Sequence, residues 1–205
     1  MDFSKDNAQS IITPELGKLL LEAISAAFGD YDKKVDAQAR AVCTATTRAM
    51  FVNDHMVFHA RDKMKKYAPY VRFVLRRGRT HLVIGPDDGS LVEVKMKKLN
   101  RNRRPSNIPT AEASDYQNQV PYQLGLPNMP SPIANLIAGY RLNSEKTGIE
   151  AVYIVYPEGA HNKWEWKLDF AAQPAPAAPE RQLVDSSPEP KAVVPKKRPL
   201  RERIA

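Results

Sequence analysis

The spacing of hydrophobic residues changes near residue 66, and this change constrains the fold more than any other feature of the chain. Before it, apolar side chains recur every three or four residues, which is the period of an amphipathic helix; after it, they alternate with polar ones, as in a β-strand. Helices followed by strands are typical of an α+β domain. We therefore expect a single domain over residues 1–170, with two helices packed on one face of a mainly antiparallel sheet of about six strands.

Two helices are predicted within residues 1–66. The first begins at Thr13, a favoured N-cap, has Pro14 at its first helical position and is expected to stop at Gly29. The second is expected over 36–66, which is long for a globular domain. Its apolar or small residues recur in near-heptad steps, at Ala39, Val42, Ala49, Met56, Ala60 and Met64. This length indicates either a kink near Asn53 or a spine through which two copies of the chain form a homodimer.

Six strands and one short helix are predicted after residue 66. Three alternating segments separated by the turn signals "RRG" and "PDDG" predict a basic three-stranded antiparallel meander over 67–99. A basic and proline-rich connection with a short helix follows over 100–132, and a β unit over 133–170. Residues 171–205 contain seven of the 17 prolines and no aromatic residue, which predicts a disordered tail with a basic end.

Several classes of protein are excluded by what the sequence lacks. It has no apolar run of about 18 residues and no signal-peptide pattern at its N-terminus, so we expect a cytoplasmic protein without a membrane partner. The single cysteine, Cys43, cannot form an internal disulfide. Neither a Walker loop nor a dinucleotide-binding glycine motif is present, and an ATPase or dinucleotide enzyme is therefore not expected.

Positive charge is concentrated between residues 61 and 104. This segment has 14 lysines and arginines against four acidic residues, a net charge of +10, whereas the whole chain carries +8. Because the first turn of a meander and the end of its third strand lie at the same edge, the bases there should form one rim. The expected rim consists of Arg76, Arg77, Arg79, Lys95, Lys97, Lys98, Arg101, Arg103 and Arg104.

A basic rim of this kind suits the phosphate backbone of DNA or RNA. The sequence thus favours a non-enzymatic nucleic-acid-binding protein that needs no cofactor. One alternative is a small adaptor or inhibitor whose rim contacts an acidic protein partner. A strand face that is only solvated and has no partner is a further alternative.

The stretch "PDDGSLVEVK" resembles the signature of the PD-(D/E)xK nucleases. The resemblance implies that Asp87 or Asp88 and Glu93 hold a Mg²⁺ ion and that Lys95 assists the attacking water. A simpler interpretation is also open. Aspartates are favoured in a tight turn, and the alternation of Val92, Glu93, Val94 and Lys95 is what any half-buried strand requires.

A pair of histidines is the remaining candidate for metal binding. His55 and His59 are four residues apart on one helix face, as metal ligands can be, and Asp62 follows one turn later. The zinc-peptidase motif requires Glu directly after the first His, and Met56 stands there. A half-buried helix face with polar residues at its edge is therefore the favoured interpretation.

Overall fold

The structure, a computed structural model, describes residues 3–76, 78–86, 90–105, 110–120 and 132–169, all within one compact unit, Met1–Gln173. Its helices are α1 (Lys5–Ile11), α2 (Pro14–Lys34), α3 (Ala37–Val42), α4 (Ala45–Met64) and α5 (Ala111–Gln117), with a 3₁₀ turn at Lys65–Tyr67. Its strands are β1 (Val71–Arg76), β2 (Arg79–Ile84), β3 (Val92–Lys98), β4 (Ala134–Leu142), β5 (Ile149–Glu158) and β6 (His161–Leu168). The predicted tail, residues 171–205, lies outside the described residues.

The six strands form one sheet in the order of the sequence, β1 to β6. Neighbouring strands are antiparallel except β3 and β4, which are parallel. Parallel neighbours need a crossover connection, and α5 lies in the segment that supplies it. The predicted α+β class and the three-stranded meander are confirmed, and the β unit predicted over 133–170 continues the same sheet through β3.

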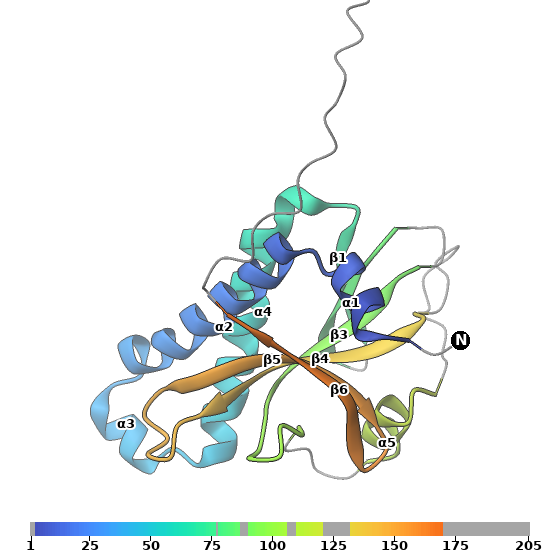
Figure 1. Ribbon diagram of the computed structural model, residues 1–205. Coiled ribbons are helices and arrows are strands. Elements are labelled where there is room, and N and C mark those ends of the chain that lie inside the picture. Colours follow the sequence, from blue (N-terminus) through green and yellow to red (C-terminus); the bar gives the residue numbers. More distant parts are fainter. Residues whose placement is uncertain (1–2, 77, 87–89, 106–109, 121–131, 170–205) are drawn as a thin grey trace, which may run out of the picture. The chain divides into compact units, whose positions relative to one another are not determined.

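Helices α2 and α4 lie side by side along one face of the sheet (Figure 1). Their apolar faces, with Leu20 and Ile24 on α2 and Met56 on α4, are fully buried with Val94 and Leu136 of the strands in one cluster. Each such side chain contributes about 1.5–3 kcal/mol by leaving water. The opposite face of the sheet carries two smaller apolar clusters, one of which includes Tyr116 of α5.

Helix α2 begins where predicted and ends later. The Thr13 hydroxyl accepts a hydrogen bond from the Leu16 backbone N–H, and Pro14 occupies the first turn. The predicted stop at Gly29 is wrong, because the helix continues to Lys34. Phe28 and Tyr31 are both buried, and this packing offsets the cost of a helical glycine, about 1 kcal/mol.

The prediction of one long second helix is wrong, because the segment forms two helices, α3 and α4. The break comes before Thr44, whose hydroxyl accepts from the Thr47 N–H at 3.1 Å and caps α4, and no break occurs at Asn53. A further short helix, α1, precedes α2 and was not predicted.

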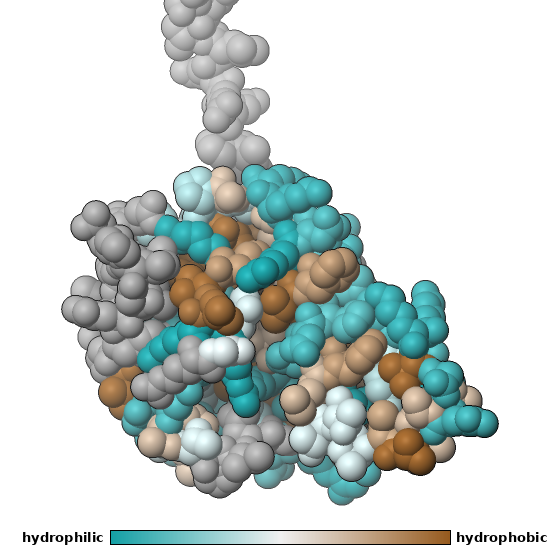
Figure 2. All heavy atoms as spheres, turned by 180° about the vertical axis from the view of Figure 1, so that it is seen from behind, coloured by the Kyte–Doolittle hydropathy of each residue, from teal (hydrophilic) through white to brown (hydrophobic). Residues whose placement is uncertain are grey.

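The division of the second helix changes which of its residues are buried. Met56, Ala60 and Met64 are buried as expected, whereas Val42 is 82% exposed. In Figure 2 the end of this unit that carries α3 shows hydrophobic surface between hydrophilic groups. Dimerisation through these helices stays a prediction.

No helix in the described part of the chain combines the length and apolar character needed to cross a membrane.

Candidate nucleic-acid interface

Four basic side chains converge on the sheet face opposite α2 and α4. Arg76 of β1 pairs directly with Arg79 of β2, and directly paired residues project from the same face. Alternation along β3 puts Lys95 and Lys97 on this face too, because Glu93, two residues earlier, pairs with Val83 of β2. We call Arg76, Arg79, Lys95 and Lys97 the basic face.

Arg79 and Lys97 are the two cations of the basic face that form no ion pair among the described residues, although the charge of Glu112 acts on Lys97 from a distance. Among the residues that the structure describes, no carboxylate forms an ion pair with either of them. Burial, together with the positive charges of Arg79 and Lys95, lowers the pKa of Lys97 to about 8. The fold therefore holds two repelling cations together and partly shields one of them from water.

Lys95 is held in place by α5. Its ammonium lies 3.9 Å from the centroid of the Tyr116 ring and 3.4 Å from Glu112 Oε1. Burial lowers the pKa of Lys95, while the charges of Glu93 and Glu112 act in the opposite direction. Its side chain is only 14% exposed, so Lys95 mainly links β3 to α5.

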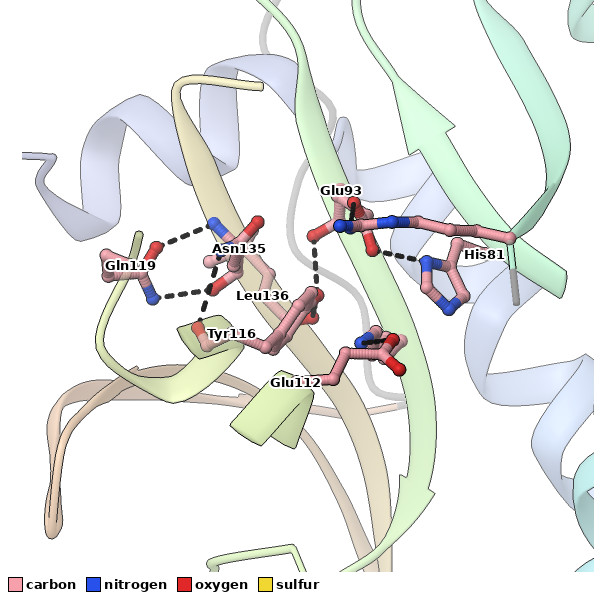
Figure 3. A network of polar contacts seen from close by, with 9 residues as sticks. His81, Glu93, Glu112, Tyr116, Gln119, Asn135 and Leu136 are labelled. Atoms are coloured by element: carbon pink, nitrogen blue, oxygen red, sulfur yellow. Dashed lines mark hydrogen bonds and ion pairs between the residues drawn. The ribbon is translucent and has the colours of Figure 1, made fainter. Parts of the chain in front are cut away.

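Glu93 lies beneath the basic face and is fully buried. One of its oxygens, Oε1, is 2.5 Å from Nδ1 of His81, which is itself 2% exposed, and Arg76 is 3.9 Å from Oε2 (Figure 3). A buried carboxylate is tolerated when positive or polar groups surround it. Glu93 thus anchors Arg76 and β2 to the central strand.

The α5 helix is fixed to β3 and β4 by buried hydrogen bonds. The Tyr116 hydroxyl is shared between the carbonyl oxygens of Leu136 at 2.6 Å and Glu93 at 3.1 Å, and burial raises its pKa well above 10. Next to it, Gln119 accepts from the Asn135 backbone N–H and donates to the Asn135 carbonyl (Figure 3). These bonds hold α5, including the Tyr116 ring that Lys95 contacts, against the sheet.

Three of the other predicted rim residues have contacts of their own. Lys98 points to the opposite face, where it lines a cavity of about 550 Å³ with Arg48 and Lys146. Arg103 pairs with Glu165 at 2.5 Å, and Arg104 donates to the Gly159 carbonyl at 3.4 Å. Arg101 is exposed in the turn after β3, and Arg77 lies outside the described residues.

The residues implied by the nuclease resemblance are only partly described. Asp87 and Asp88 lie outside the described residues. Glu93 and Lys95 do share a face, but Glu93 is in contact with His81 and Lys95 with Glu112. A divalent ion at Oε1 of Glu93 would compete with His81 for that oxygen.

Two residues of this site, His81 and Tyr116, were missed by the sequence-based reasoning. His81 is in phase with Arg79 along β2, so its face could be derived from alternation. Its contact with Glu93 depends on the β2–β3 register, in which Val83 is opposite Glu93. The approach of Tyr116 depends on how the crossover packs, which no local pattern indicates.

No protein-family model, no curated protein and no solved structure matches this chain.

Replacing Lys97 by methionine is expected to stabilise the fold. At pH 7 the wild-type chain keeps a partly buried ammonium charged, and removing it should raise the free energy of unfolding by roughly 1–2 kcal/mol. Because the pKa of Lys97 is about 8 when folded and near 10.5 when unfolded, the unfolded chain binds more protons between these values. The free energy of unfolding of the wild type therefore rises between about pH 8 and pH 10.5. The difference in this free energy between Lys97→Met and the wild type becomes smaller over the same range.

Urea denaturation at pH 7 and pH 10, with the exposed Lys33→Met variant as control, measures this effect. Equal stability of wild type and Lys97→Met at pH 7 would show that Lys97 carries no such cost.

Proposed function

We propose that the protein binds nucleic acid by contacting the phosphate backbone with its basic face. The observation that supports this most is the pair Arg79 and Lys97, two neighbouring cations that form no ion pair with a carboxylate among the described residues. Keeping like charges close costs stability, and such costs are typical of sites retained for binding an anion. Phosphate groups bound by each of the two side chains would offset the repulsion.

The neighbouring residues suit the same role. Arg76 is oriented by the buried Glu93, and its side chain is 21% exposed. An arginine held in this way can offer two parallel N–H groups to a phosphate. Contacts of this type carry little sequence information, and we therefore propose sequence-tolerant binding.

Titration of labelled nucleic acid at several salt concentrations tests the proposal. We expect a DNA duplex of about 20 base pairs to bind with an affinity that falls steeply with salt, with a log–log slope of about −3 if three phosphates are contacted. A single-stranded RNA of the same length shows which nucleic acid is preferred. No binding to either at low salt contradicts the proposal.

The same titration with and without magnesium separates binding from catalysis. We expect the nucleic acid to stay intact in both conditions. Magnesium-dependent cleavage that Glu93→Ala abolishes would instead identify a nuclease of the type implied by "PDDGSLVEVK".

A further inference from the structure

A second polar cluster lies on the other side of the molecule, between the two helices that cover the sheet. Asp30 of α2 contacts two residues of α4, His55 and His59. Its Oδ2 atom is 2.7 Å from Nδ1 of His55 and 2.7 Å from Nε2 of His59. The three side chains are 15% to 23% exposed, so small solutes can reach them.

This grouping differs from the one indicated by the sequence. His55 and His59 share a helix face as expected, but Asp62 is not the third member, because it is 68% exposed and pairs with Lys65. Asp30 occupies that place from the neighbouring helix. The long separation in sequence between Asp30 and the histidines explains why spacing alone did not reveal it.

The contacts converge on one atom. Oδ2 of Asp30 faces both imidazole nitrogens and, at 2.9 Å, the ammonium of Lys34. A carboxylate has two oxygens with about four acceptor positions, yet all three donors meet at the same oxygen. Hydrogen bonds from Lys34, and then from His59 and His55, hold the pKa of Asp30 well below its usual range, so this carboxylate is ionised at neutral pH.

We propose that Asp30, His55 and His59 form a binding site for a Zn²⁺ ion. Two imidazoles and one carboxylate are a ligand set that zinc uses, with water in the fourth position, and imidazole favours zinc over magnesium. The three ligand atoms lie within 4.8 Å of one another. No step of this inference depends on nucleic-acid binding.

Movements of about 1.5 Å or less between ligand atoms bring the site to zinc geometry. Metal–ligand bonds of about 2.0–2.2 Å at tetrahedral angles place ligand atoms about 3.3 Å apart. The oxygen–nitrogen distances of 2.7 Å must therefore open by about 0.6 Å, which rotation of half-buried side chains allows. Lys34 has to leave the carboxylate, and its side chain is 53% exposed and able to turn into solvent.

The surroundings of the histidines support an ordered site. The ring of Phe51 stacks on His55 with centroids 4.2 Å apart and planes 16° apart, which fixes the imidazole orientation. Bound zinc would link α2 to α4 and stabilise the helical layer. At zinc concentrations about 100 times the dissociation constant, the melting temperature should rise by roughly 5 °C.

Zinc titration of the full chain, after removal of metals with a chelator, tests this inference. We expect calorimetry to show one Zn²⁺ per chain and thermal unfolding to shift upward. His55→Gln/His59→Gln should weaken binding at least 100-fold and remove the thermal shift. His161→Gln, which alters an exposed histidine of β6, should bind zinc as the wild type does.

A second variant covers the case in which the double variant fails to fold. Asp30→Asn keeps a hydrogen-bonding side chain of the same size but removes the charged ligand, and it should also lose zinc. The inference is overturned if the wild type binds no zinc at a free Zn²⁺ concentration of about 100 μM, which would nearly saturate even a site with a micromolar dissociation constant. It is equally overturned if zinc binding survives in Asp30→Asn and in the double histidine variant, or is lost in His161→Gln.

Discussion

Replacing Arg79 by glutamine together with Lys97 by methionine is expected to weaken binding to a DNA duplex by roughly 10- to 100-fold at low salt. Each phosphate that the variant no longer binds lowers the slope of log affinity against log salt by about one, so the slope should fall by about two. The two residues are chosen because they have no acidic ion-pair partner within the described residues, and their removal breaks no salt bridge. The measurement is the duplex titration repeated at several salt concentrations.

The matched control is Lys18→Gln/Lys33→Gln. It removes the same two charges from exposed positions of α2, on the opposite side of the sheet from the basic face. If net charge alone attracted the duplex, both double variants would bind equally weakly, and the basic face would have no special role. In the part of the salt series near 0.15 M, we expect the control to stay within about threefold of the wild type, because charges more than about 8 Å from the duplex are largely screened there.

The element order was predictable because it follows from local rules. Alternation predicted six strands within residues 67–99 and 133–170, where all six lie, and the N-cap at Thr13 predicted the start of α2. The errors have a common physical cause. Whether α2 passes Gly29 depends on how Phe28 and Tyr31 pack against the rest of the fold. The break before Thr44 had a local signal, because a threonine can cap a helix, but an apolar periodicity running through it obscured that signal.

The candidate sites were harder to predict because each joins segments far apart in sequence. Positive charge between residues 61 and 104 was visible, but strand alternation and register decide that Lys97 meets Arg79 while Lys98 faces the other way. Contacts such as His81 with Glu93, and Asp30 with His55, also depend on pairing between separate elements. A sequence shows which face a residue occupies within its own element; the partner on the next element comes from the assembled fold.

Glu93→Gln is expected to lower the free energy of unfolding by about 2–4 kcal/mol. The carboxylate is fully buried, with Nδ1 of His81 at 2.5 Å and the charged guanidinium of Arg76 at 3.9 Å. Removing one member of a buried charged group leaves the others without compensation, which costs more than the pair itself contributes. Urea denaturation followed by circular dichroism measures the change. Glu112→Gln is the control, because its pair with Lys95 is partly exposed and should contribute less than about 1 kcal/mol.

The direction of this change also separates the two roles that Glu93 can have. A carboxylate kept to hold a catalytic metal is commonly a burden on stability, so its neutralisation leaves the fold equally stable or more stable. A carboxylate that anchors Arg76 and His81 is needed by the fold itself. An unchanged or increased stability of Glu93→Gln would therefore contradict the anchoring role and make the nuclease the better interpretation. A clear loss of stability, together with weaker duplex binding through a misplaced Arg76, is the result that the proposed function requires.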